Sequence, residues 1–373
     1  MTNWNTCRNV LCIRADNMGD VIMSGPAIRS LKQHPGCKIT LLTSAAGSLI
    51  APFMPAVDDV MVADLPWVQT TKGINAAACT QLIADLKSKE FDAVIIFTVY
   101  SQSPLPSALI AYMAGIPLRL AYCRENPYGL LTDWVPDKEP YCSIMHQVER
   151  DLLLLSKINI GMKHEASAAV LTLVNFQNYK GTLDSKLHQK GVSTFKKYIL
   201  LHAGVSDAKR TYPVEKWREL LKLLRDLEYE IILTGSVSER ALAGDIIHDS
   251  KTSGIHNIAG ELNIGEWISL ISNAALVVSV NTSTIHIAAA VKTPVIVLYA
   301  LTNPQHTPWN AISKVLPYSI SSDMQSKNEV IQYVNKTYYG TYVPVPEPAE
   351  IFMHAQQLLG ARSIENFAGV VSV

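Results

Sequence analysis

Short runs of Val, Ile and Leu alternate with segments of helical period along most of this 373-residue chain. Strands that are apolar along their whole length are typical of parallel sheets covered by helices on both faces. Their alternation with helices predicts stacked βαβ units. Because the pattern occurs in two series of similar size, we expect an α/β fold of two doubly wound, Rossmann-like domains facing a cleft.

The two series are separated by a polar stretch at residues 175–191, where we place the domain boundary. The first series predicts strands at 9–14, 38–42, 59–62, 93–97 and 118–122, with helices at 21–33, 47–53, 75–87, 106–114 and 146–158. The second predicts strands at 198–202, 229–233, 276–279 and 293–299, with helices at 214–227, 239–249, 264–273, 284–291 and 347–359. These patterns divide the chain into domains at residues 1–175 and 176–345 and a tail at 346–373.

The amino-acid composition argues against several classes of protein. Lys and Arg (32) balance Asp and Glu (32), and charged residues make up only 17% of the chain, which argues against a partner that is a nucleic acid. A hydrophobic fraction of 48% argues against disorder. The apolar run at residues 10–13 is too short for a signal peptide, and the six cysteines form no CxxC pair. We therefore expect a cytoplasmic protein with reduced thiols and at most peripheral membrane contact.

The loop after the first predicted strand ends in Met18, Gly19 and Asp20. Gly19 permits close approach of the backbone to a ligand, and Asp20 stands at a helix start. A carboxylate there serves either as a plain cap or as a positioned base. The loop lacks the GxGxxG pattern, so a nicotinamide dinucleotide is disfavoured.

The loop that begins at His202 contains Gly204, Lys209 and Arg210 before a helix that starts after Pro213. A strand end, a glycine, two cations and a helix start are typical of a diphosphate site. Solvated surface charge is the alternative interpretation of the two cations.

The loop after the next strand contains Gly235 and leads to Glu239 on the first helical turn. Glu239 is placed to accept hydrogen bonds from ribose hydroxyls, or to interact with the helix dipole. Both interpretations remain open from the sequence.

A further turn reads Asn281-Thr282-Ser283-Thr284-Ile285-His286, between a buried strand and a helix rich in alanine. The backbone N–H groups at such a helix start suit an anion. His286 is either a packed core histidine or a ligand-facing side chain, and the preceding turn favours the second.

In order and spacing these four loops resemble the lipopolysaccharide heptosyltransferases of glycosyltransferase family 9. The resemblance extends over roughly residues 9–308. It is carried by residues 14–21 with Pro26 and Leu31, 146–150, Lys209-Arg210 with Pro213 and Trp217, Gly235, and 281–286 followed by Thr293-Pro294. It implies a two-domain GT-B enzyme that uses an ADP-activated heptose and no metal. It also implies that the helix in residues 346–373 crosses back to the N-terminal domain.

By resemblance, Asp20 is the catalytic base, and Met18 and Gly19 of the same loop are expected to bind the nucleotide sugar. Lys209 or Arg210 would bind the phosphates and Glu239 the ribose, with His202, Gly204 and Gly235 beside the nucleotide sugar. Asn281, Thr282, Ser283 and His286 would form the donor turn. Asn281 stands where the family has aspartate and Ser283 where it has glycine, so a carboxylate normally near the donor is absent.

The sequence thus predicts an inverting, metal-independent glycosyltransferase without a cofactor. Its N-terminal domain would bind a saccharide or lipopolysaccharide-type glycolipid acceptor, and its C-terminal domain a nucleotide-sugar donor, expected to be ADP-heptose. The alternatives are a nucleotide-sugar epimerase or hydrolase of GT-B architecture and a non-catalytic nucleotide-sugar binding protein.

Overall fold

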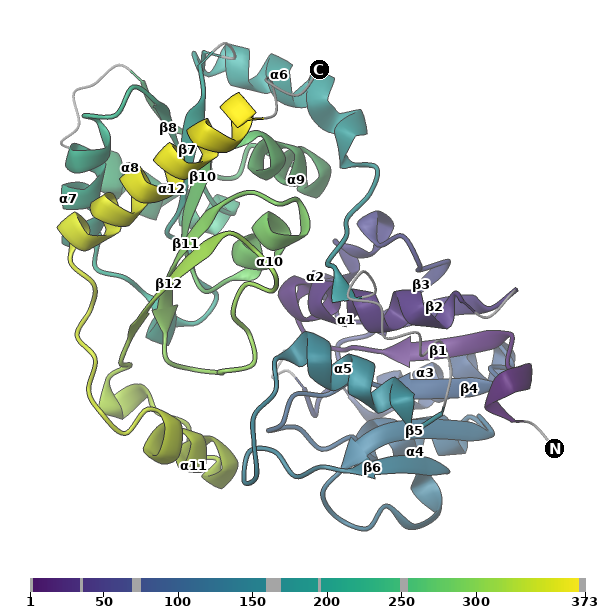
Figure 1. Ribbon diagram of the computed structural model, residues 1–373. Helices are drawn as coiled ribbons and strands as arrows, with labels where there is room; N and C mark the ends of the chain where they lie inside the picture. The colour runs from purple at the N-terminus through teal and green to yellow at the C-terminus, as the bar shows by residue number, and fades with distance from the viewer. Residues whose placement is uncertain are drawn as a thin grey trace. The chain divides into compact units, whose positions relative to one another are not determined.

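The computed structural model describes residues 3–33, 36–68, 75–158, 169–193, 196–248 and 254–368. For residues 361–368 only the backbone is described. The chain forms two compact units (Figure 1). The first comprises Met1–Val174 with Pro304–His306, and the second comprises Asn175–Asn303 with Thr307–Val373. A three-residue strap from the C-terminal half of the sequence therefore belongs to the first unit.

The first unit contains a six-stranded parallel sheet in the order β3-β2-β1-β4-β5-β6. Its strands are β1 Asn9–Ile13, β2 Lys38–Thr43, β3 Asp59–Val62, β4 Ala93–Ile96, β5 Leu118–Cys123 and β6 Asp133–Pro136. Its helices are α1 Met18–Leu31, α2 Ala45–Ser48, α3 Ala76–Ser88, α4 Leu105–Met113 and α5 Gln147–Ser156. The order reverses between β1 and β4, so the loops after these two strands meet at the topological switch point.

The second unit repeats this plan with the order β12-β11-β10-β7-β8-β9. Its strands are β7 Tyr198–His202, β8 Glu230–Thr234, β9 Ile255–Asn257, β10 Leu276–Val280, β11 Val295–Ala300 and β12 Ser313–Tyr318. Its helices are α6 Lys180–Gln189, α7 Val214–Leu224, α8 Arg240–Ile247, α9 Ile264–Asn273, α10 Ser283–Ala290, α11 Glu329–Tyr338 and α12 Pro348–Ala368. Its switch point lies between β10 and β7.

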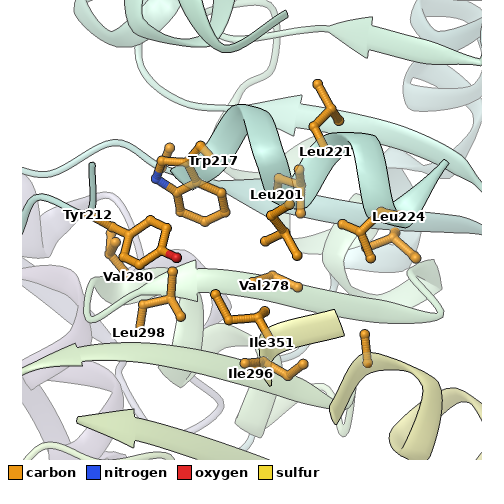
Figure 2. Close-up of a cluster of buried hydrophobic side chains, with 14 of the residues drawn as sticks. Leu201, Tyr212, Trp217, Leu221, Leu224, Val278, Val280, Ile296, Leu298 and Ile351 are labelled. Atoms are coloured by element: carbon orange, nitrogen blue, oxygen red, sulfur yellow. The ribbon is translucent and has the colours of Figure 1, made fainter. Parts of the chain in front are cut away.

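Helix α7 anchors the core of the second unit (Figure 2). Trp217 is 1% exposed and meets Tyr212 edge to face, with ring centroids 5.3 Å apart. The Tyr212 hydroxyl donates to the Pro346 carbonyl oxygen at 2.8 Å. This contact fixes the end of the β7–α7 loop, which carries the two cations of the predicted site.

The last helix packs within the second unit. Ile351, Ala355 and Leu359 of α12 lie in the core of that unit, and the helix packs on α7. The expected crossing of residues 346–373 to the N-terminal domain stays a prediction. Residues 369–373 lie outside the described chain.

Other differences concern short or polar elements. Strands β6, β9 and β12 were not predicted, and neither were α6 and α11. Helix α1 starts at Met18 instead of residue 21, because Asn17 and Asp20 form a reciprocal capping box. The predicted end of α8 at residue 249 lies outside the described residues.

Candidate functional site

The candidate site of the first unit lies after β1, where Asp20 occupies the third position of α1. The Asn17 side chain accepts from the Asp20 backbone N–H, and the Asn17 N–H donates to Asp20 Oδ2 at 3.2 Å. This reciprocal pairing fixes the carboxylate at the helix start. The plain-cap interpretation is thus correct as geometry, and the carboxylate has further contacts.

Arg14 directly follows β1. It is 0% exposed and lies between two carboxylates. Its Nη2 donates to Asp20 Oδ1 at 3.1 Å, and its Nε lies 3.3 Å from Asp16 Oδ2. Burial by itself would lower the pKa of Arg14, but these carboxylates raise it. Arg14 therefore carries a fixed positive charge that orients Asp20.

Asp16 is a second acid in the same loop. Burial raises its pKa to about 6, although Arg14 opposes the shift. Gln102 Nε2 donates to Asp16 Oδ1 at 2.6 Å, from the segment that follows β4. The switch point thus brings together a charged arginine and two carboxyl groups, those of Asp16 and Asp20.

A small hollow opens at this edge, bordered by Asp16, Trp67, Thr98, Gln102 and Ser103. The Trp67 indole N–H donates to Ser107 Oγ at 3.0 Å, which fixes the ring at the border. Hydroxyl, amide and carboxylate groups around an indole are a lining that polar, hydroxylated ligands favour.

The motif at residues 146–150 serves the interior of the first unit. Arg150 is 0% exposed and donates to both oxygens of Asp137, at 3.0 and 2.9 Å, and to Glu139 Oε2 at 2.7 Å. Its Nε donates to the Thr98 carbonyl oxygen at 3.0 Å, and its guanidinium lies 4.1 Å from the Tyr122 ring centroid. Fully paired buried charges of this kind fix their surroundings firmly.

The candidate site of the second unit lies at the carboxyl ends of β10, β7 and β8, which are neighbours in the sheet. His202 ends β7 and is 7% exposed, and burial lowers its pKa. Its Nδ1 lies 3.1 Å from Thr234 Oγ1, whose hydroxyl donates to the Leu201 carbonyl oxygen at 3.4 Å. This geometry assigns the proton to Nδ1, so that Nε2 is an acceptor.

Glu239 lies directly over the backbone of the two predicted glycines. A Cβ atom added to Gly204 would be 2.1 Å from Glu239 Cδ, and one added to Gly235 would be 3.0 Å from Glu239 Oε2. The carboxylate also accepts from the Ser236 N–H at 2.6 Å. The two glycines therefore make room for this carboxylate, and three predicted residues meet at one point.

The structure separates the two predicted cations. Lys209 Nζ forms an ion pair with Asp207 Oδ2 at 2.8 Å, which lowers the pKa of Asp207 although burial opposes the shift. Arg210 Nη1 donates to the Asn281 carbonyl oxygen at 3.0 Å, and the Arg210 carbonyl accepts from the Tyr318 hydroxyl at 2.7 Å. Arg210 is therefore the cation that contacts the turn at residues 281–286.

Asn281 follows β10 and is 7% exposed. Its Nδ2 donates to Thr302 Oγ1 at 3.2 Å and to the Ala300 carbonyl oxygen at 3.4 Å. These acceptors fix the amide orientation. Among the described residues, Asn281 Oδ1 and Arg210 Nε have no hydrogen-bond partner.

The remaining residues of the turn start helix α10. Thr282 is its N-cap and accepts from the Thr284 N–H at 3.4 Å, and Ser283 is its first residue. His286 is 5% exposed on the second turn. The turn therefore keeps a regular helix start with asparagine and serine in place of aspartate and glycine.

Three site residues were missed by sequence reasoning: Asp16, Gln102 and His306. Asp16 is close enough to Arg14 in sequence to suggest a pair, since a charged residue at the end of an apolar strand needs a partner. Gln102 and His306 give no local signal, because only the fold brings them near β1. His306 Nε2 lies 3.5 Å from Asp20 Oδ1.

The described residues contain neither a metal-binding cluster nor a helix that could span a membrane. Within the described ranges, no group of three or more His, Cys, Asp or Glu side chains is arranged to hold a metal ion. None of the helices in the same part of the chain combines the length and apolar character needed to cross a bilayer.

Comparisons with known proteins agree with the geometry. The family described as glycosyltransferase family 9 (heptosyltransferase) matches residues 79–338, well over half of the chain. Lipopolysaccharide heptosyltransferase 2 of Escherichia coli is 26% identical over 306 residues, which are 80% of this chain and 84% of that protein.

Solved structures match over nearly the whole chain. The E. coli ADP-heptose lipopolysaccharide heptosyltransferase II superposes with a TM-score of 0.72 at 22% identity, covering 95% of this chain and 99% of the other. A family 9 glycosyltransferase from Veillonella parvula gives a TM-score of 0.74 at 14% identity, covering 96% and 98%. The expected α/β fold of the GT-B class is confirmed, and so is the resemblance seen in the four loops. The chain is a glycosyltransferase and belongs to glycosyltransferase family 9, the heptosyltransferase family.

Proposed function

We propose that this protein transfers a heptose or a related sugar, with inversion, from an ADP-linked donor to a saccharide or lipopolysaccharide-type acceptor. Family membership supports sugar transfer, and the similarity to the E. coli ADP-heptose lipopolysaccharide heptosyltransferase II supports ADP-heptose as the donor class. A transferase is favoured over the epimerase, hydrolase and binding-protein alternatives, because a positioned carboxylate stands at the first switch point. The observation that carries the proposal is the Asp20 carboxylate, oriented by Arg14 and the helix start.

In this proposal the second unit binds the donor. Arg210 and the N-terminus of α10 would bind the diphosphate, where positive charge and backbone N–H groups favour an anion. Glu239 would accept hydrogen bonds from the ribose hydroxyls above Gly204. As the bond to the anomeric carbon breaks, Arg210 would stabilise the charge that grows on the leaving diphosphate.

The first unit would bind the acceptor and supply the base. Asp20 would take the proton of the acceptor hydroxyl as that oxygen attacks the anomeric carbon from the face opposite the diphosphate. Arg14 donates a hydrogen bond to Asp20 Oδ1, which would hold the carboxylate in one orientation during the reaction. The hollow bordered by Trp67 and Gln102 would receive part of the acceptor.

We also propose that the reaction uses neither a metal ion nor a cofactor, with Arg210 and helix N–H groups stabilising the negative charge. A reducing compartment, the cytoplasm, is proposed for the protein. All six cysteines, which lie in the described ranges, are free thiols, and such thiols persist under reducing conditions.

The test is ADP release from ADP-heptose, with and without a heptose-deficient lipopolysaccharide acceptor. Asp20→Asn should lower kcat by about 10²-fold or more and leave ADP affinity unchanged, because the base acts in the chemical step alone. The matched control is Asp59→Asn, a partly exposed carboxylate of the same unit on edge strand β3. Near-normal turnover by Asp20→Asn would refute the assignment of the base.

A further inference from the structure

The strap Pro304–His306 carries a histidine to the proposed base. It leaves the second unit after Asn303, belongs to the first unit for three residues, and returns to the second at Thr307. His306 Nε2 lies 3.5 Å from Asp20 Oδ1, the same oxygen that accepts from Arg14 Nη2 at 3.1 Å. Neither the sequence motifs nor the comparisons give this histidine a role.

Several hydrogen bonds of the buried residue Gln305 hold the strap in place. Gln305 is 0% exposed. Its Nε2 donates to Glu139 Oε2 at 2.8 Å, its Oε1 accepts from the Tyr100 N–H at 3.3 Å, and its carbonyl accepts from the Gln147 N–H at 3.0 Å. A side chain fixed at both polar atoms and at its own backbone cannot shift without breaking several bonds.

The anchor of the strap is itself fixed by the motif at residues 146–150. Glu139 Oε2 accepts from Arg150 Nη1 as well as from Gln305. Burial raises the pKa of Glu139 although Arg150 opposes the shift, so the ionised pair depends on its partners. Contacts thus run continuously from Arg150 through Glu139 and Gln305 to the residue beside Asp20.

We propose that His306 is a positioning residue for Asp20 in the transfer reaction, and that Gln305 holds it in place. The inference rests on the proposed function. His306 contacts the carboxylate on the oxygen shared with Arg14, while the Asn17 N–H holds the other oxygen. The carboxylate is thereby held from three sides, and its angle to an acceptor hydroxyl is set before the substrate arrives.

The first experiment measures steady-state transfer of heptose from ADP-heptose to a heptose-deficient lipopolysaccharide by the full-length chain. We expect His306→Ala to lower kcat about 10-fold or more, because a misplaced base loses rate in the chemical step. KM for ADP-heptose should stay within about 2-fold. His306→Gln, which offers an N–H to the carboxylate, should recover part of the loss. His354→Ala, which changes a partly exposed histidine on α12, is the matched control.

A second experiment distinguishes a role of His306 in positioning Asp20 from a role in folding. Gln305→Met keeps the size of the side chain and removes both of its polar contacts, so it should lower kcat like His306→Ala. The double variant should be no slower than the slower single variant, since both changes disturb the same contact, that of His306 with Asp20.

The outcomes are distinct. Normal kcat in His306→Ala, with an active wild type and an inactive Asp20→Asn, would overturn the role of His306 and leave the proposed function intact. Additive losses in the double variant would also overturn it. An inactive wild type would refute the proposed function and the inference with it. If His306→Ala fails to fold, His306→Gln and Gln305→Met decide by the same criteria.

Discussion

Replacing Asp16 by asparagine should stabilise the first unit at neutral pH, although it removes a carboxylate that faces Arg14. Burial raises the pKa of Asp16 from 3.8 to about 6 in spite of that arginine and of the hydrogen bond from Gln102, and the neighbouring Asp20 and Asp151 add to the rise. A difference of about two pKa units corresponds to about 3 kcal/mol between the two protonation states. At pH 7.5 the ionised Asp16 therefore costs the folded state about that amount.

The direction of this change in the free energy of unfolding follows from proton linkage. A carboxyl group with a higher pKa in the folded state binds its proton more tightly there, so its contribution to stability is complete below pH 4. That contribution is lost as the pH rises through 6. The asparagine side chain is neutral at every pH and can still accept from Gln102. The free energy of unfolding of Asp16→Asn should exceed that of wild type by up to about 3 kcal/mol at pH 7.5, and the difference should shrink toward pH 4.

The assay is native-state hydrogen exchange of the β1 amides at pH 7.5 and pH 4.5, which reports the free energy of unfolding of the first unit by itself. Asp59→Asn is the control, because the Lys89 ion pair lowers the pKa of Asp59 and the pair is solvent-accessible. That variant should lose at most about 1 kcal/mol at pH 7.5. If Asp16→Asn proves less stable than wild type at pH 7.5, attraction to Arg14 outweighs burial and the reasoning fails.

Three further changes test other parts of the structure. Arg150→Met leaves Glu139 buried without its cation and should lower the free energy of unfolding by about 3–5 kcal/mol, measured by urea denaturation. Gly204→Ala should displace the Glu239 carboxylate and weaken ADP binding by about 1.5–3 kcal/mol, measured by calorimetry, with a small change in melting temperature. Asn281→Asp turns an N–H donor to Ala300 into an acceptor and should cost about 1–3 kcal/mol in thermal stability. An unchanged value in any of the three assays would contradict the contact concerned.

The central strands were predictable because burial on both faces leaves a continuous apolar run in the sequence. Leu11, Cys12 and Val278 are each 0% exposed in the middle of their sheets. Edge strands do not show this pattern, since one side faces solvent and tolerates proline and charge. Strand β12 reads Ser-Lys-Val-Leu-Pro-Tyr and β9 has only three residues, so neither run could be recognised.

The site was predictable only where it follows a predicted strand directly. Asp20, Gly204 and Asn281 stand in loops at strand ends, and the topology alone places such loops at a switch point. The contact of His306 with Asp20 depends on a strap that joins the first unit from far along the sequence. The choice between Lys209 and Arg210 likewise required the side-chain partners.

Both candidate sites combine fixed side chains with buried polar atoms that have no hydrogen bond among the described residues. In the first unit the Asp20 carboxylate is paired, so that it is oriented before any ligand arrives, as the proposed base requires. Nη1 of the neighbouring Arg14 is buried without such a bond, and in the second unit the same holds for Asn281 Oδ1 and Arg210 Nε. A buried polar atom without a hydrogen bond destabilises the fold, and a ligand that supplies the bond recovers that free energy on binding. We therefore expect a ligand that supplies these bonds to stabilise the unit it binds.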